Sequence, residues 1–178
     1  KVADVSKAIT SGFKEVDSTI LLIGQRKNEL GGSAYYALFD ELGKNIPKPN
    51  LAEVEAEIWA LTDVIDAGLV RATHDISDGG VAVAMAEMSF ENEIGFEIET
   101  EQDMRTDHWL FSQTGGFILE ADNINIPAIV TIMSGYGIPV TKLGRTTAHQ
   151  VMVFGNVIHV PLAKVKESWH GGLRDKLK

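Results

Sequence analysis

The sequence predicts one domain that contains both α-helices and β-strands. Segments with helical periodicity alternate with segments typical of strands, no internal repeat divides the chain, and polar glycine-bearing loops separate the apolar segments. The 178 residues, 44% of them apolar, are enough for one generous hydrophobic core and few for two. We therefore expect a single domain over residues 1–178, with about six strands and about six helices.

Charge and composition exclude several classes of protein. The net charge of −9, with 16 scattered Lys and Arg residues, argues against nucleic acid as a partner, because binding it needs a basic face. No run of about 18 apolar residues could span a membrane, and the opening residues lack a signal-peptide core. The chain has no cysteine, which excludes disulfides and thiolate nucleophiles and fits the cytoplasmic location that we expect. Because the chain opens without an initiator Met, we interpret it as part of something longer, although processing would look the same.

The first half of the chain predicts a buried strand followed by two helices. After an irregular lead-in, residues 19–24 form an apolar run without alternation, which indicates burial on both faces. Ser33 is a natural N-cap for a helix over residues 34–42, and a longer helix is expected over residues 51–68, ending at Gly68. We expect their apolar residues at helical spacing to face the core, namely Tyr35, Leu38, Phe39 and Leu42 in the first helix and Val54, Ile58, Leu61 and Ile65 in the second.

The rest of the chain is organised around residues 72–90, ATHDISDGGVAVAMAEMSF. This stretch predicts a strand end, a polar turn and a helix start, which is where α/β proteins often place their chemistry. Asp78 or Ser77 can cap the helix, while Gly79 and Gly80 let a ligand approach free N–H groups at the positive end of the helix dipole. The helix itself is indicated by apolar residues at spacings of four and three and by small residues on its other sides: Val81, Met85 and Met88, with Ala82, Ala84 and Ala86.

Two polar loops carry interpretations that the residues alone leave open. In the turn, Asp78 is either a simple N-cap or part of a ligand site, and Asp75 favours the site, because a carboxylate at a strand end can hold Mg²⁺ together with phosphate. Its neighbour His74 has no obvious partner that would orient it as a base. In the earlier glycine-bearing loop, Arg26 and Lys27 either contact phosphate oxygens or are simply solvated.

The second half of the chain predicts short strands and helices. Residues 95–100 alternate Phe96 and Ile98 with glutamates, as in a strand with one wet face. A short helix over residues 105–111 leads to the polar segment 112–116. The further elements are expected as a strand at 117–120, a helix at 127–136, strands at 139–143, 151–154 and 157–160, and a last helix from Pro161 through Trp169.

Four segments carry a resemblance to a known family: LLIGQRKNELGGS, THDISDGGVAVAMAEM, LFSQTGGF and KLGRTT…VMVFGNVIHVPLAKVKESW. They resemble the C-terminal domain of the aminoimidazole ribonucleotide synthetase-like superfamily over nearly the whole chain. Within it, the chain most resembles the last domain of the phosphoribosylformylglycinamidine synthases. The pattern HDxSDGGxAVAxAEM is specific, because other members of the superfamily have a different sequence in the glycine turn at this position.

With the element count, the resemblance implies an α+β fold, a mixed β-sheet of ferredoxin-like character with helices packed over it. It also implies a part in the synthase of purine biosynthesis that uses ATP and glutamine-derived ammonia to convert formylglycinamide ribonucleotide to its amidine. The implied cofactors are ATP and Mg²⁺. The implied partners are the missing N-terminal domains of the same protein, its glutaminase and small accessory subunits, and formylglycinamide ribonucleotide. The family protein has two related halves. The motifs of this chain resemble those of the second, auxiliary half more than those of the first.

Carried over by motif, the metal-binding Asp of the family falls on Asp75, and its substrate-contacting Ser-Glu-Ser segment falls on Ser112, Gln113 and Thr114. Gln113 stands where Glu is usual, and Gly115-Gly116 replaces a polar pair. A neutral amide lacks a carboxylate's charge, so we expect no catalytic residue here and no synthase activity from the isolated domain. The nucleotide or phosphate site is expected at Asn28, Gly31, Gly32, Ser33, Ser77, Asp78, Gly79, Gly80, Ser112, Gln113 and Thr114, with Asp75 as the metal ligand.

Two other classes of function stay open at this point. One is another enzyme of the superfamily, of the hydrogenase-maturation dehydratase or thiamine-phosphate kinase type. The other is a purely structural domain that forms an interface and binds no ligand of its own. The N-terminal sequence of the gene would separate these readings, because the resemblance places the ATP-binding aspartates and glycines of all these families there.

Overall fold

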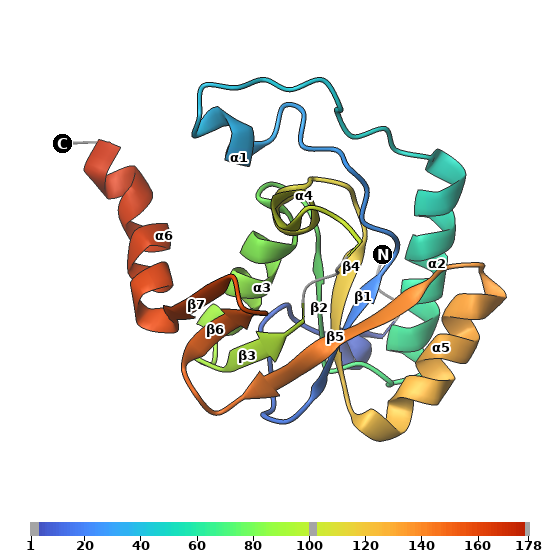
Figure 1. Ribbon diagram of the computed structural model, residues 1–178. Helices are drawn as coiled ribbons and strands as arrows, with labels where there is room; N and C mark the ends of the chain where they lie inside the picture. Colours follow the sequence, from blue (N-terminus) through green and yellow to red (C-terminus); the bar gives the residue numbers. More distant parts are fainter. Residues whose placement is uncertain (1–3, 100–102, 177–178) are drawn as a thin grey trace.

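The computed structural model describes residues 4–99 and 103–176 and contains one seven-stranded mixed sheet (Figure 1). The strand order is β2-β4-β1-β5-β3-β6-β7, and neighbouring strands are antiparallel except for β3 and β6. The strands are β1 Thr19–Ile23, β2 Ala72–Asp75, β3 Gly95–Ile98, β4 Phe117–Ala121, β5 Val140–Thr147, β6 Val151–Phe154 and β7 Ile158–Pro161. The expected α+β fold with a mixed sheet is confirmed.

Helices cover both faces of this sheet. They are α1 Ala34–Ala37, α2 Leu51–Asp66, α3 Gly80–Phe90, α4 Thr106–Phe111, α5 Ile126–Gly135 and α6 Leu162–Lys176, with 3₁₀ turns η1 Val5–Lys7 and η2 Asn123–Asn125. Figure 1 shows α2 and α5 side by side on one side of the sheet and α3 on the other. None of the helices in the described part of the chain is both long and apolar enough to cross a membrane.

The central strand β1 is buried on both faces, as its unbroken apolar run predicts. Ile20 and Leu22 join one apolar cluster with residues of α3 and α4, whereas Leu21 and Ile23 join a second cluster with residues of α2 and α5. Successive side chains of a strand point to opposite faces, so β1 contributes to both layers. The sheet therefore divides the core expected from the chain length into two apolar layers.

The two helices that follow β1 differ from expectation. The helix predicted over residues 34–42 ends at Ala37, and Leu38, Phe39 and Leu42 are 79%, 61% and 77% exposed, so their predicted burial is wrong. Asp40 adopts a positive φ of 55°, a conformation that interrupts a helix. Helix α2 is present, but it turns a different stripe to the sheet than expected, since Val54 is 37% and Ile58 50% exposed and the buried residues are Glu57, Ala60, Leu61 and Val64.

Strand directions bring three loops to one end of the sheet. Because β1 and β2 both run antiparallel to β4, they end where β4 begins, at Ile23, Asp75 and Phe117. We call this end the upper edge, and it lies at the top of Figure 1 together with α1 and α4. The strand order β2-β4-β1 makes the three strands neighbours, as the family resemblance implies.

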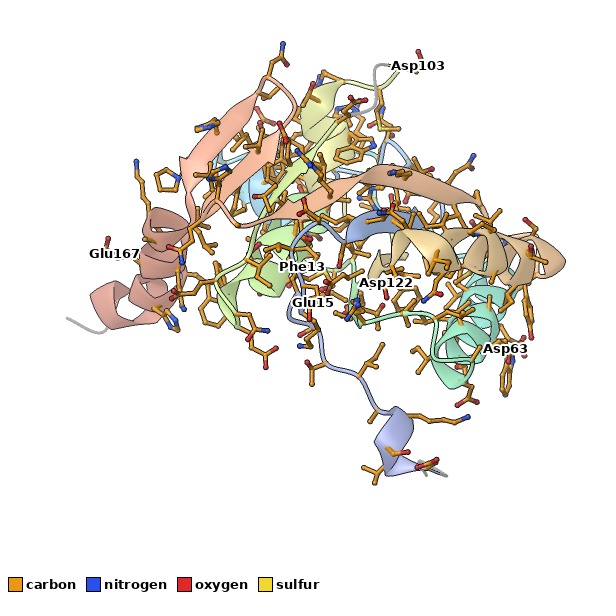
Figure 2. The ribbon with its side chains drawn as sticks, turned by 90° about the horizontal axis from the view of Figure 1, so that it is seen from below. Phe13, Glu15, Asp63, Asp103, Asp122 and Glu167 are labelled. Atoms are coloured by element: carbon orange, nitrogen blue, oxygen red, sulfur yellow. The ribbon has the colours of Figure 1, made fainter. Side chains whose placement is uncertain are left out.

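The opposite end, which we call the lower edge, is where β1 begins, at Thr19, and β4 ends, at Ala121. Glu120 is fully buried near it, and its carboxylate accepts hydrogen bonds from the backbone N–H groups of Lys14 at 2.7 Å and Glu15 at 2.9 Å. Figure 2, seen from below, shows Glu15 and Asp122 near the centre of this edge. The carboxylates of Glu120 and Asp122 both accept hydrogen bonds from groups of this chain.

Candidate functional site

The upper edge is built around a buried arginine. Arg26 follows β1 and is only 7% exposed, and its guanidinium donates to the carbonyl oxygens of Ser112, Thr114 (2.6 Å), Gly115 (3.4 Å) and Trp109 (3.4 Å). Burial lowers the pKa of Arg26 to about 10, and nearby Glu29 counteracts this effect. Arg26 is thus neither a solvated surface cation nor free to bind phosphate. It ties the loop after β1 to the segment before β4.

A chain of hydroxyl groups makes the same connection a second time. Ser112 Oγ donates to the carbonyl oxygen of Lys27 at 2.7 Å and accepts from the N–H of Glu29 at 3.1 Å. Thr114 Oγ1 donates to Glu29 Oε2 at 2.8 Å and lies 3.1 Å from Ser112 Oγ. Ser112 and Thr114 are both buried. These predicted binding residues are therefore engaged inside the protein, where they shape the loops.

Gln113 lies between these two residues and joins all three loops. With its amide oxygen turned toward them, it accepts from the N–H of Gly79 at 3.2 Å and from the N–H of Ala34 at 3.0 Å. The N–H of Gly80 donates to the carbonyl oxygen of Ser77 at 3.0 Å. The free N–H groups expected at these two glycines are thus already occupied. A neutral amide oxygen sits where an anion would otherwise meet the start of α3.

The glycines of the turn are required by packing. Gly79 and Gly80 have φ values of +80° and +67°, in the left-handed region that favours glycine. A Cβ at Gly79 would lie 2.2 Å from a methyl carbon of Val83, and one at Gly80 would lie 2.5 Å from the carbonyl oxygen of Leu110. The N-cap of α3 is Gly79 and makes no side-chain cap hydrogen bond, so the predicted capping by Asp78 or Ser77 is wrong. The left-handed turn places Gly79 itself at the cap position.

Three polar residues of the turn face solvent. Asp75, Ser77 and Asp78 are exposed, and the Asp75 side chain retains 64% of its accessible surface. The ring of His74 lies beside it, with Nδ1 at 3.6 Å from Asp75 Oδ1. His74 has the orienting partner that the sequence did not reveal, since its Nε2 lies 3.1 Å from a carboxylate oxygen of Glu87 on α3. A histidine and a carboxylate thirteen positions apart give no local signal of this pairing.

The first loop separates into buried and exposed parts. Ser33 caps α1 as predicted and accepts from the N–H of Tyr36 at 3.2 Å. The N–H groups of Gly31 and Gly32 donate at 2.7 Å to carbonyl oxygens of residues 42–45. Of the twelve predicted site residues, the five that are exposed are Asn28, Gly32, Asp75, Ser77 and Asp78, whereas Gly31, Ser33, Gly79, Gly80, Ser112 and Thr114 are buried and Gln113 is half-buried.

The donor set for a metal is incomplete within this chain. Residues 4–99 and 103–176 contain no group of three or more His, Cys, Asp and Glu side chains that could hold an ion. Magnesium is commonly held by one or two carboxylates together with phosphate oxygens and water. The exposed carboxylate of Asp75 fits the part of a single protein ligand, and the other ligands would have to come from a nucleotide or from another domain.

The hollows at the upper edge include two that differ in size. The larger, of about 560 Å³, is lined by residues such as Arg26, Trp109 and Lys142. The smaller, of about 240 Å³, lies beside Gln113 and Thr114 and is closed on its other side by α2. Glu57 of α2 faces the smaller hollow and was missed in the sequence, although its spacing from Ala60, Leu61 and Val64 puts it on the buried stripe.

Comparisons with known proteins found relatives that match nearly the whole chain. The relatives include the phosphoribosylformylglycinamidine synthase subunits PurL of Methanothrix thermoacetophila, 32% identical over 98% of this chain, and of Alkaliphilus metalliredigens, 34% identical over 97%. The chain spans about a quarter (24%) of the length of each.

Among solved structures, Thermotoga maritima PurL complexed with FGAR superposes with a TM-score of 0.78 at 18% identity, covering 90% of this chain and 30% of that one. The same protein complexed with ATP gives 0.70 at 17% identity, covering 89% and 27%. These likenesses show the fold. The family model described as AIR synthase related protein, C-terminal domain, matches residues 15–155, and the chain therefore belongs to this family.

Proposed function

We propose that this chain is the C-terminal domain of an ATP-dependent phosphoribosylformylglycinamidine synthase of purine biosynthesis. It is supported by the PurL relatives, which match nearly the whole chain over about a quarter of their own length. It is also supported by the T. maritima PurL structures, which are described as complexes with FGAR, ATP, ADP and AMPPCP. The complete protein would act in the cytoplasm, as a C–N ligase that forms an amidine.

Within that protein, the upper edge faces the N-terminal domains and helps to hold a Mg-phosphate group. The observation that carries this proposal is the gathering of three polar loops at one edge, with the carboxylate of Asp75 exposed among them. Asn28, Gly32, Ser77 and Asp78 are exposed with it and can reach a ligand directly. The buried members of the predicted set, from Ser33 to Thr114, hold the loops in place.

The domain supplies the auxiliary side of the nucleotide site. Gln113 has no titratable group, so it cannot serve as an acid or a base, and its amide oxygen is already occupied by two backbone N–H groups. The isolated domain accordingly has no synthase activity. The glutaminase and the small accessory subunit complete the assembly, in keeping with the solved structure of PurLQS from T. maritima, whose chain this fold also matches, with a TM-score of 0.75.

Two other functions have weaker support. The thiamine-monophosphate kinase of Stenotrophomonas maltophilia shares the fold, with a TM-score of 0.60, but at 12% identity this likeness carries no activity. An interface role is favoured by the exposed Leu38, Phe39 and Leu42, and an interface can coexist with the site, whereas a purely structural domain cannot.

Asp75→Asn in the full-length protein tests the site. It should weaken Mg-dependent nucleotide binding about tenfold or more, because hydrogen bonds to charged groups contribute roughly 1.5–3 kcal/mol. The melting temperature should not change, since Asp75 is exposed and caps no helix. Asp17→Asn, another exposed aspartate but at the lower edge, is the matched control. Unchanged nucleotide binding in Asp75→Asn would remove the proposed role of the turn.

A further inference from the structure

The smaller hollow of the upper edge contains a buried carboxylate that the proposed function does not use. This pocket, of about 240 Å³, is walled by α2, by the segment 47–50 and by the loops on either side of Gln113. Glu57 projects into it from α2 and is only 6% exposed. Space for the carboxylate is provided by Gly24, where a Cβ would lie 2.6 Å from Glu57 Oε1.

Glu57 makes no hydrogen bond or ion pair with any of the residues that the structure describes. Its oxygen atoms are not among the described side-chain atoms that are both cut off from solvent and unpartnered, so they open into the pocket. Burial raises the pKa of Glu57, the nearby carboxylate of Glu53 raises it further, and Lys27 opposes both effects. A cation that enters the pocket beside this carboxyl would favour its charged form and oppose both effects.

The other carboxylates of the pocket are already satisfied. Glu53 Oε2 lies 3.3 Å from the ammonium of Lys27. Glu29 accepts from the hydroxyl of Thr114 at 2.8 Å and from the N–H of Lys48 at 3.3 Å. Among the three glutamates that line the pocket, Glu57 has no hydrogen-bonded or ion-paired partner in the described part of the chain, although Lys27 and Lys48 also line the pocket.

We propose that this pocket binds a primary ammonium group, with the carboxylate of Glu57 as its counter-ion. A metal ion fits less well, because the described residues offer no cluster of three ligands. An ammonium group is compact and has three donors, which suits one carboxylate and a few neighbouring oxygen atoms. It comes either from a free small amine or from a lysine side chain elsewhere in the full-length protein. The second source rests on the proposed function.

Methylammonium is the probe for a free amine, and tetramethylammonium is its control, since it carries the same charge without N–H donors. Melting temperatures of the full-length protein are measured in both chlorides at equal ionic strength. If the amine is free, methylammonium raises the melting temperature over tetramethylammonium, and its half-saturating concentration rises at least tenfold in Glu57→Gln. Glu55→Gln, an exposed glutamate on the same helix, keeps the wild-type response.

If a lysine side chain fills the pocket, methylammonium has no specific effect, but Glu57→Gln lowers the melting temperature while Glu55→Gln does not. The wild-type protein then yields a zero-length carbodiimide cross-link between Glu57 and a lysine outside residues 1–178, which decides the matter even if the variant fails to fold. The proposal is overturned if methylammonium has no specific effect, the cross-link is absent, and Glu57→Gln is at least as stable as the wild type. That last outcome leaves the Asp75 test untouched, so the two proposals fail separately.

Discussion

Each end of the sheet contains a buried glutamate, and the two glutamates differ in their hydrogen-bond partners. At the lower edge, Glu120 accepts two backbone hydrogen bonds from the lead-in segment, at 2.7 and 2.9 Å. At the upper edge, Glu57 is almost as buried but has no partner among the described residues. The difference shows which end of the domain is complete by itself. The lower edge is closed by the chain's own backbone, whereas the unpartnered Glu57 supports our proposal that the upper edge meets a further group.

Exposed apolar side chains are more numerous at the upper edge, although Val5, Val16 and Ile124, near the lower edge, are exposed as well. Leu38, Phe39 and Leu42 leave the loop after α1 at the upper edge, and Ile46 and Leu51 continue the apolar surface toward α2. Apolar residues gathered in this way commonly mark a surface that another domain covers. The upper edge thus combines an unpartnered carboxyl group with exposed apolar area, and both features are consistent with its proposed contact with the N-terminal domains.

The largest effect that would sharpen this comparison is expected from Glu120→Ala. The substitution removes the acceptor of two N–H groups and should lower the free energy of unfolding by about 2–4 kcal/mol, since each unsatisfied buried donor costs roughly 1–3 kcal/mol. Urea unfolding of this chain measures it. Glu120→Gln keeps an acceptor oxygen and should lose less. If Glu120→Ala costs no more than Glu57→Ala, the two edges do not differ as described.

A smaller effect is expected from Gln113→Ala at the upper edge. The substitution frees the N–H groups of Gly79 and Ala34, and loss of a comparable helix cap costs about 1 kcal/mol. The same urea titration detects it. Gln113→Glu retains the acceptor and adds a negative charge at the start of α3, so it should be at least as stable as the wild type. Equal stability of Gln113→Ala and the wild type would contradict the bridging role of this amide.

The smallest effect is the pH dependence contributed by Glu57 in this chain alone. Its pKa is raised in the folded state above the ordinary value of 4.5, so the folded state favours the protonated form. Its stabilising contribution is complete below pH 4.5 and is lost as the pH rises through the raised pKa. Wild type and Glu57→Gln should therefore diverge in stability with rising pH, with the wild type falling behind. Parallel unfolding curves from pH 4 to pH 8 would contradict the raised pKa.

Much of the fold could be predicted from local patterns. The unbroken apolar run of β1 and the spacing of Val81, Met85 and Met88 in α3 each led to the correct element and the correct burial. Helix α2 was predicted, but its buried face was assigned wrongly. Its sequence carries two apolar stripes, and packing against the sheet decides which one is buried. The small side chain of Ala60 allows the closer approach, so Ile58 is left outside.

The candidate site could be located from the sequence, but its internal bonding could not. Glycine turns and strand ends pointed to three loops, and the topology brings these loops together. The roles of Arg26, Gln113 and Glu87 depend on partners from distant parts of the chain, as in the bonds of Arg26 to residues 109–115. Side-chain bonds of this kind follow from tertiary structure and leave no periodic signal.

The position of β1 in the sheet also has a consequence for how the protein is made. Its neighbours are β4 and β5, and Ser18, just before β1, bonds to Thr146, 128 positions later. Within this domain β1 is synthesised before both β4 and β5, so neither of its edges can be paired until those later strands have been made. Pairing across such distances is slow, and an unpaired apolar strand is prone to aggregate in the meantime. Until β4 and β5 have been translated, β1 has to be covered by some other surface if it is to stay out of aggregates.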